Sequence, residues 1–401
     1  MIPQAIVAGG GIGGLAAACA LLRKGISVTV LEQASGLSEI GAGLQISANG
    51  AKALFDLGLE DELRKVWCEP TGKEVRMWNS GESWKLFDLG AASRELYGAP
   101  YFMIHRADLH RVLYEAVGRL RSDAVRFSTR CVGARQDEFG VTVHLESGEE
   151  IQADALIAAD GVHSVIRNSL AGEQKAEFTG CVAWRGLIAA ERLPERLRRS
   201  IGVNWVGPGG HVVHYLLRGG EIFNFVGIVE RDDWRVESWT EVGSTEECLR
   251  DFEGWDDDIH LMIRNLERPY KWALLSRQPL DRWVWGRIAL LGDAAHPTLP
   301  MMAQGGNMAL EDGVVLARCF AECGGNVPAA LKSYQGTRLE RTSRLVRAAN
   351  DNAKRFHNPV LRHRDTAKQY VDREWHEDKV RERYDWVFTY DPTTARLSDA
   401  D

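Results

Sequence analysis

The chain has 401 residues, of which 45% are hydrophobic and 26% charged, and this ordinary globular mix excludes disordered, fibrous and disulfide-scaffold proteins. Fifty-six acidic against 49 basic side chains give a net charge of −7, which argues against binding nucleic acid through its phosphates. The seven cysteines contain no C-x-x-C pair, so we expect reduced thiols, a cytoplasmic protein and no metal site.

The first segment that needs interpretation is a nearly apolar stretch at residues 5–22. No Lys or Arg precedes it and five of its residues are glycine, which is unlike a signal peptide or a membrane helix. No other run approaches the roughly 20 apolar residues that a membrane span requires. The sequence therefore predicts no membrane partner.

The glycines in this stretch have the spacing of a dinucleotide-binding loop. A buried strand is expected at Ala5–Ala8 and a helix at Leu15–Arg23, with Gly9, Gly11 and Gly14 between them. In such a loop the first glycine permits the tight turn and the second admits a pyrophosphate. The third lets helix and strand pack closely, and the helix N-terminus faces the phosphates.

A second strand, Ser27–Leu31, ends in a carboxylate at the position where a ribose is usually bound. Glu32 lies 18 residues after Gly14, and an acid there can accept hydrogen bonds from ribose hydroxyls. Together these features predict nucleotide binding, but they leave FAD and NAD as equal alternatives.

Two later segments have the same strand-then-turn pattern. A strand expected at Ile151–Ala159 runs into Asp160 and Gly161, and Arg287–Leu291 runs into a turn that contains Asp293. An aspartate in such a turn often only binds its own backbone, so neither segment is informative alone. A helix is expected after the second turn, and its first residues are Gly305, Gly306 and Asn307.

The three segments together resemble the single-component flavoprotein aromatic hydroxylases, a family that includes p-hydroxybenzoate, salicylate and 3-hydroxybenzoate hydroxylases. The glycine fingerprint with Glu32, the Asp-Gly segment with Ser164 and Arg167, and the GDAAHP segment at 292–297 occur in family order and spacing. The resemblance covers about residues 1–345. It implies an α/β fold with a Rossmann-like FAD-binding domain, an inserted β-sheet substrate domain and a C-terminal helical segment.

The resemblance also implies a set of cofactor-binding positions. FAD would be the bound cofactor, and NADH or NADPH a transient co-substrate that reduces it before O2 adds at flavin C4a. The positions carried over are Gly9, Gly11, Gly14, Glu32, Gln33, Gln45, Arg106, Asp160, Asp293, Gly305, Gly306 and Asn307. The N–H groups of the helix at Gly305 would stabilise negative charge on the reduced flavin.

Candidates for handling the substrate lie in the strand-rich middle third. On the expected strand 211–217, His211 and Tyr215 share one face while His214 points to the other. His211 with Tyr215 would bind and deprotonate a phenol, because a histidine can change charge near neutral pH. An ordinary hydrogen-bonded sheet histidine is the alternative for both histidines.

Three residues are candidate substrate contacts, namely Pro300, Met301 and His214. The resemblance implies that the backbone carbonyl of Pro300 accepts from the substrate hydroxyl, as the matching proline does in p-hydroxybenzoate hydroxylase. Met301 would suit a benzenoid ring, although methionine clusters are more often plain core.

The family pattern predicts a discontinuous domain organisation. The FAD domain would comprise residues 1–75, 100–175 and 280–345, the substrate sheet residues 76–99 and 176–279, and the helical segment residues 346–401. Aromatic residues in 374–390 indicate either a closing helix or a dimer contact, so both a monomer and a homodimer remain open.

Three functions stay open on the sequence alone. The leading one is a monooxygenase of aromatic compound catabolism that hydroxylates a small hydroxylated aromatic acid, such as salicylate or 3-hydroxybenzoate. A second is another flavoenzyme of the same fold, either a prenyl-chain reductase or a hydroxypyridine-carboxylate hydroxylase. The third is a nucleotide-fold binding protein without catalysis.

Overall fold

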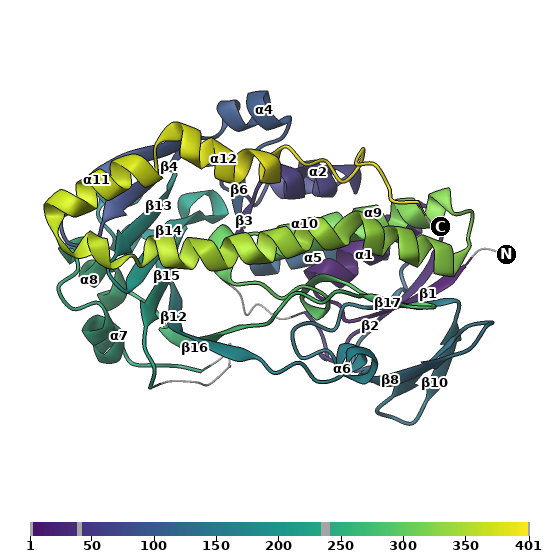
Figure 1. Cartoon of the computed structure of the whole chain (residues 1–401). Helices are drawn as coiled ribbons and strands as arrows, with labels where there is room; N and C mark the ends of the chain where they lie inside the picture. The colour runs from purple at the N-terminus through teal and green to yellow at the C-terminus, as the bar shows by residue number, and fades with distance from the viewer. Residues whose placement is uncertain (1–2, 38–41, 234–240, 400–401) are drawn as a thin grey trace.

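The computed structural model describes residues 3–37, 42–233 and 241–399. Two large sheets organise them, one of six strands and one of seven, and a long helix crosses the molecule between its two halves (Figure 1). The expected α/β architecture with a second sheet domain and a helical C-terminal segment is confirmed.

The six-stranded sheet has the order β17-β18-β11-β1-β2-β7 and is parallel except at β17. Its central strands are almost wholly aliphatic because both faces are covered, as is usual for parallel sheets. The expected strands at its centre are confirmed. The strands are β1 (Gln4–Ala8), β2 (Ser27–Leu31), β7 (Val125–Arg126), β11 (Ala155–Ala158), β17 (Val284–Trp285) and β18 (Ile288–Leu290).

Three helices pack together on this sheet: α1 (Ile12–Arg23), α5 (Arg106–Leu120) and α9 (Gly305–Glu322). The backbones of α1 and α9 approach so closely that a Cβ on Gly313 would lie 2.8 Å from the amide nitrogen of Ala17. This close packing fixes the N-terminal ends of both helices relative to the sheet.

One expected strand is wrong in detail. The segment 151–159 is not a single strand but two, β10 (Glu150–Ala153) and β11, which belong to different sheets. The chain changes sheets at Asp154, whose backbone N–H donates to the Gln4 carbonyl while its carboxylate accepts from the Gln4 N–H. A three-stranded sheet of β8 (Cys131–Gln136), β9 (Val141–Leu145) and β10 results.

The seven-stranded sheet has the order β16-β12-β15-β14-β13-β4-β5. The side chains of its central strands alternate between two buried faces. One face lies under the short helices α7 (Thr245–Asp251) and α8 (Asp257–Arg264), and the other faces the first sheet and the C-terminal helices. The strands are β4 (Gly72–Met77), β5 (Ser83–Asp88), β12 (Glu177–Ala189), β13 (Ile201–Gly207), β14 (Gly210–Leu217), β15 (Ile222–Glu230) and β16 (Tyr270–Ser276).

Small elements join the two sheets. A two-stranded pair, β3 (Gly43–Ile46) with β6 (Phe102–His105), lies between them. Strand β3 leads into α2 and strand β6 leads into α5. The remaining short helices are α2 (Ala48–Asp56), α3 (Glu60–Arg64), α4 (Ala91–Tyr97), α6 (Val165–Ala171), α7 (Thr245–Asp251) and α8 (Asp257–Arg264). Six 3-10 turns complete the connections, at 190–192, 195–197, 218–220, 292–294, 300–302 and 359–362.

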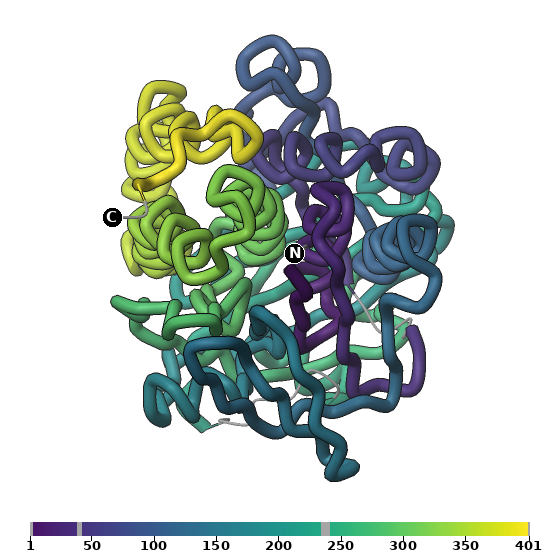
Figure 2. The backbone as a smooth tube through the Cα atoms, turned by 90° about the vertical axis from the view of Figure 1, so that its right-hand side faces the viewer, coloured from purple at the N-terminus to yellow at the C-terminus, as the bar shows by residue number. Residues whose placement is uncertain are grey.

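The C-terminal segment closes one side of the molecule. Helix α10 (Val327–Phe356) is followed by α11 (Arg364–Glu374) and α12 (Glu377–Phe388), and the final residues run back along α9 and α10 (Figure 2). Ser333 Oγ donates to the Ser398 carbonyl, and Arg318 donates to the Pro392 carbonyl. Within the aromatic segment 374–390, Trp375 stacks on Phe356 and Phe388 packs on Tyr101, so these rings are packed within their own chain.

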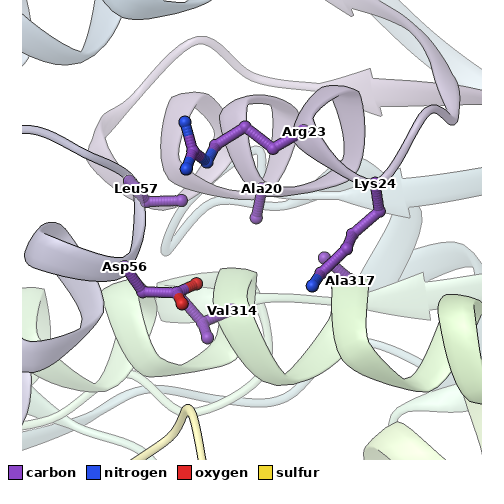
Figure 3. Close-up of a pocket in the computed structure, with 7 residues that line it drawn as sticks. All are labelled: Ala20, Arg23, Lys24, Asp56, Leu57, Val314 and Ala317. Atoms are coloured by element: carbon purple, nitrogen blue, oxygen red, sulfur yellow. The ribbon is translucent and has the colours of Figure 1, made fainter.

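The described part of the chain holds no helix that is both long and apolar enough to cross a bilayer, and no group of three side chains suited to a metal ion. All seven cysteines are free. A small crevice of about 100 Å³ opens between α1, α2 and α9 (Figure 3). Arg23, Lys24 and Asp56 line it at the end of α1 opposite the glycine loop, so it lies away from the predicted site.

Candidate active site

The glycine loop has the geometry that its spacing predicts. Gly9 has a φ of 107°, and a Cβ there would lie 2.3 Å from the Ala159 carbonyl oxygen. A Cβ on Gly14 would lie 1.9 Å from the Gly9 oxygen, so only glycine allows this packing. Beside Gly11, by contrast, no atom lies within 4 Å of a Cβ position, which leaves open space at the N-terminus of α1. That space can admit a pyrophosphate.

Glu32 closes the other side of the loop. One carboxylate oxygen accepts from the Gly10 N–H at 2.7 Å and the other from the Ala34 N–H at 2.7 Å. Gln33 beside it is exposed. The carboxylate therefore shapes the loop, and its expected contact with a ribose stays a prediction.

Asp160 follows β11 at the same sheet edge. Its Oδ2 accepts from the Val165 N–H at 3.0 Å, and Ser164 caps α6 by accepting from the Arg167 N–H at 2.9 Å. Among the described residues Asp160 Oδ1 is buried without a hydrogen-bond partner, and burial raises the pKa of this carboxyl. The aspartate thus binds its own turn but keeps one acceptor atom unused.

Arg106 and Asp293 carry opposite charges at the start of α5 and in the turn after β18. Both side chains reach solvent, yet both are surrounded by enough protein that desolvation lowers the pKa of Arg106 and raises that of Asp293. The charge of Asp293 opposes the shift of Arg106, and the charges of His296 and then Arg106 oppose the shift of Asp293. Side chains that are exposed to solvent and yet surrounded by protein line a recess in the protein surface.

The N-terminus of α9 lies against this recess. A Cβ on Gly305 would be 4.0 Å from Asp293 Oδ1, and beside Gly306 no atom lies within 4 Å of a Cβ position. Asn307, in contrast, is fully engaged with protein. Its Nδ2 donates to the carbonyls of Gln45 and Ala303, and its Oδ1 accepts from the Ser47 N–H. Asn307 therefore holds β3 against α9 rather than presenting a free amide.

These features fit FAD. The open glycine loop would take the pyrophosphate, Glu32 and the unused Asp160 oxygen would take hydroxyl donors, and the recess at Arg106 and Asp293 would take the ribitol and flavin. The uncapped N–H groups of α9 at Gly305 and Gly306 supply positive potential where a reduced flavin is anionic.

A polar cluster lies next to β3, on the sheet face that turns toward α9. We call Gln45, Lys73, Tyr101 and Tyr215 the lysine–tyrosine cluster. Gln45 Oε1 accepts from Lys73 Nζ at 2.6 Å and from Tyr101 OH at 2.7 Å, and Lys73 also donates to Tyr101 OH at 2.8 Å. Tyr215 lies against β3, because a Cβ on Gly43 would be 2.5 Å from its ring.

The cluster is buried enough to shift its ionisation. Desolvation lowers the pKa of Lys73 to about 7 and raises that of Tyr215 well above its ordinary value, the latter opposed by a hydrogen bond to Gln45. Within the described chain Lys73 has no ion pair, although its ammonium lies 4.7 Å from the centre of the Tyr101 ring. The cluster therefore contains an amine whose charged form has no counter-charge among the described residues.

The two predicted histidines lie in different environments. His211 shares its sheet face with Tyr215, as expected, and its Nδ1 lies 2.7 Å from His357 Nε2. His214 faces the opposite core, where it stacks on Phe223 at 4.8 Å. Its pKa falls to about 3, mainly through burial and secondarily through Arg76 and Arg199. The structure does not bring His214 to the lysine–tyrosine cluster.

The turn 300–302 is held by the long helix. Asn352 of α10 donates to the Met301 carbonyl at 3.3 Å and to Met302 Sδ at 2.8 Å. Met301 is buried and Pro300 is exposed. Asn352 also donates to Tyr384 OH of α12, so the C-terminal helices reach this turn.

Sequence reasoning missed Lys73, Tyr101, Tyr384 and His357. Tyr384 lies in the aromatic segment 374–390, which the sequence indicated as a closing helix or a dimer contact. Nothing in the sequence around Lys73 or Tyr101 marks either as functional, because their pairing with Gln45 arises only when β3, β4 and the residue before β6 come together.

The family model described as "FAD binding domain" matches residues 3–349, and the chain belongs to this family. It is an FAD-dependent monooxygenase of the single-component aromatic hydroxylase type. The resemblance drawn from the three sequence segments is thereby confirmed, as is FAD as the cofactor.

Particular relatives narrow the comparison. The chain is 41% identical over 357 residues to 3-hydroxybenzoate 6-hydroxylase of Polaromonas naphthalenivorans (strain CJ2). The aligned region covers 88% of each protein. It is 38% identical over 357 residues to a 3-amino-4-hydroxybenzoate 2-monooxygenase of Streptomyces platensis, with 89% of each covered. Klebsiella pneumoniae HpxO, solved with FAD and uric acid, superposes with a TM-score of 0.81 at 30% identity, over 95% of this chain and 93% of that one.

Proposed function

We propose that the enzyme uses NADH or NADPH and O2 to hydroxylate the ring of a small hydroxylated aromatic acid, and that Lys73 binds the acid's carboxylate. Salicylate and 3-hydroxybenzoate are the first candidates, because relatives at 38–41% identity act on hydroxybenzoates. The observation that carries the proposal is that Lys73, which contacts Gln45 of β3 and Tyr101, has no counter-charge among the described residues.

The energetics favour an anionic ligand there. A cation removed from water without a counter-charge is destabilised, which is why the pKa of Lys73 falls to about 7. A bound carboxylate would restore the charged form and add a charge-assisted hydrogen bond, worth about 1.5–3 kcal/mol. A neutral aromatic ligand would gain neither.

The other residues have separable roles in this proposal. Bound FAD supplies the oxygen-activating chemistry, and Arg106, Asp293 and the start of α9 would hold its reactive end. His211, neutral because burial lowers its pKa, would accept the phenol proton, with Tyr215 beside the ring. Buried Met301 would exclude water from the reacting centre.

The remaining predictions fit the same proposal. The seven free thiols support a cytoplasmic enzyme. NADH or NADPH would act as a visiting reductant, since the sequence has a single nucleotide fingerprint.

The test is a panel assay of aromatic-stimulated NAD(P)H oxidation with O2 uptake and product mass. The panel contains salicylate, 3-hydroxybenzoate, a hydroxypyridine carboxylate and phenol. We expect one acid to be hydroxylated with a KM about 10–100 times lower than that of phenol, as a charge-assisted contact implies.

The variant Lys73→Met sharpens the assay. It should raise the KM of the acid by about tenfold or more and leave that of phenol unchanged, whereas Lys85→Met, on the exposed face of β5, should change neither. A panel in which no aromatic compound stimulates oxidation would contradict the proposed function. An unchanged acid-to-phenol ratio in Lys73→Met would contradict the role of Lys73.

A further inference from the structure

Three ionisable side chains form a row of short polar contacts from the buried sheet face to the surface. His211 Nδ1 lies 2.7 Å from His357 Nε2, and His357 Nδ1 lies 3.3 Å from a carboxylate oxygen of Glu230. Both histidines are buried, while the Glu230 side chain is 58% exposed. The row therefore spans the end of α10 and the rim of β14 and β15.

When both rings are uncharged, the contacts determine which nitrogen of each ring bears a proton. An ionised Glu230 only accepts, so His357 Nδ1 is the N–H donor and the neutral ring keeps a lone pair on Nε2. His211 must then donate from Nδ1 to that lone pair. Within the described residues no partner occupies the remaining nitrogen of His211, Nε2, which is left as an acceptor.

The outer end of the row opens to water. A surface cavity of about 340 Å³ is lined by Glu230 and His357 together with Lys354 and Arg362. The contact with His357 holds the pKa of Glu230 below its usual range, so this carboxylate is ionised near neutral pH. Small solutes can therefore reach His357 from outside while the protein covers His211.

The geometry of this end is fixed by further contacts. The Gly209 N–H, in the turn between β13 and β14, donates to the His357 carbonyl at 3.1 Å, and Phe356 packs on the His211 ring at 5.1 Å. Contacts from both sides of the interface thus hold the two rings, tilted by 44°, with Nδ1 of His211 next to Nε2 of His357, and proton transfer between them requires this approach of the two nitrogens.

We propose that Glu230, His357 and His211 form a proton relay that carries the phenol proton of the substrate to solvent. The inference rests on the proposed function, which places the substrate phenol at His211. In the forward direction the phenol O–H bond breaks and the proton joins His211 Nε2. The proton on His211 Nδ1 passes to His357 Nε2, and that on His357 Nδ1 passes to Glu230 and then to water.

The relay is reset when a proton from solvent passes back through Glu230, His357 and His211 to the phenolate oxygen of the product, which restores the starting proton positions of both rings. Charge balances throughout, since one proton leaves the phenol and one reaches solvent, and the site gains the phenolate that activates the ring. A neutral His211 suits this task, and burial is the main reason why its pKa lies well below the ordinary value. The charged groups facing His357 are Glu230, Lys354 and Arg362.

The competing explanation is that the row only pins α10 to β14. The variant His357→Gln separates the two, because an amide can hydrogen-bond to His211 and fill the space but cannot pass a proton. His357→Ala instead opens the space to imidazole supplied in solution. Lys354→Gln is the matched control, since it lines the same cavity on the same helix outside the row.

The assay measures coupled hydroxylation of the panel acid that the wild-type holoenzyme turns over fastest, in dilute bulky buffer, with FAD content recorded for each variant. We expect His357→Gln to lower turnover about 10–100-fold, the usual range for one positioned proton-transfer group. His357→Ala should be equally slow and should recover severalfold in 50 mM imidazole, an effect absent from wild type and from His357→Gln.

Glu230→Gln provides a second route if the buried variants fail to fold, because Glu230 is exposed. It should slow turnover severalfold and make the rate depend on buffer concentration, while FAD content and KM stay unchanged. Wild-type turnover in His357→Gln, no imidazole rescue of a flavin-loaded His357→Ala, or an unaltered Glu230→Gln would each overturn the relay. A wild-type enzyme inactive on the whole panel would overturn the proposed function instead.

Discussion

The cofactor side and the substrate side of this enzyme are built by different means. The glycine loop, the turns at Asp160 and Asp293 and the start of α9 place main-chain groups within short stretches of sequence. The lysine–tyrosine cluster draws single side chains from β3, β4, β14 and the segment before β6, so no short stretch contains it. A cradle of local turns can stay constant in a family while a cluster of separate side chains changes with the substrate.

The largest expected effect tests whether FAD binding depends on the close backbone packing of the glycine loop. Gly14→Val would place a Cβ 1.9 Å from the Gly9 oxygen, so the loop must deform and the enzyme should purify without FAD. The ratio of flavin to protein absorbance measures this.

Gly118→Ala is the control for that variant. It lies within helix α5 with no atom within 4 Å of its Cβ position, so it should keep its flavin and gain about 0.5–1 kcal/mol in unfolding free energy. A Gly14→Val enzyme that purifies with FAD would show that the glycine loop accommodates a side chain at this position.

A smaller effect tests the charge of the lysine–tyrosine cluster. The pKa of Lys73 in the free enzyme is about 7, below its unfolded value, so the lysine is charged below pH 7 and increasingly neutral above it. A bound carboxylate favours the charged form, so the apparent KM of the acid should rise by up to about tenfold per pH unit above pH 7.

Initial rates between pH 6 and 9 measure this dependence. The KM of phenol should stay flat over the same range, and so should that of the acid in Lys73→Met. A wild-type KM that is constant between pH 7 and 9 would show that Lys73 does not carry the ligand's counter-charge.

The smallest effect tests the assignment of the two sheet faces. His214 packs on Phe223 in the far core and its Nε2 lacks a partner among the described residues, so His214→Phe removes an unsatisfied polar atom. Turnover should stay within about twofold and unfolding free energy within about 1 kcal/mol. Urea titration and steady-state kinetics measure both. A loss of hydroxylation with FAD still bound would place His214 in the site after all.

The same contrast explains what could be predicted from the sequence. Gly9, Gly14 and the strands around them follow from spacing and local sterics, and the structure has them where the pattern puts them. The face shared by His211 and Tyr215 follows from the two-residue period of a strand. Which histidine meets a partner does not, because His357 lies 146 residues further along the chain.

One difference has a definite physical reason. The break of 151–159 into two strands depends on a bond between Asp154 and Gln4, a contact that no local pattern indicates. That Asn307 faces the flavin through the N–H groups of its helix stays a prediction, whereas the contacts of its side chain with Gln45, Ser47 and Ala303 were not expected.

Helix α10 sets a constraint on length that no single contact reveals. Arg338 near its middle forms buried ion pairs with Glu311 and Asp312 of α9, while His357 at its end meets His211 on the far sheet. The 19 residue-to-residue steps from Arg338 to His357 span about 28 Å, and each step turns the helix by about 100°. Removing one residue between these two points would swing the imidazole away from its neighbour while the arginine stayed in place. The two contacts therefore fix the number of residues in this interval of α10, so insertions are tolerated more readily in the loops than along it.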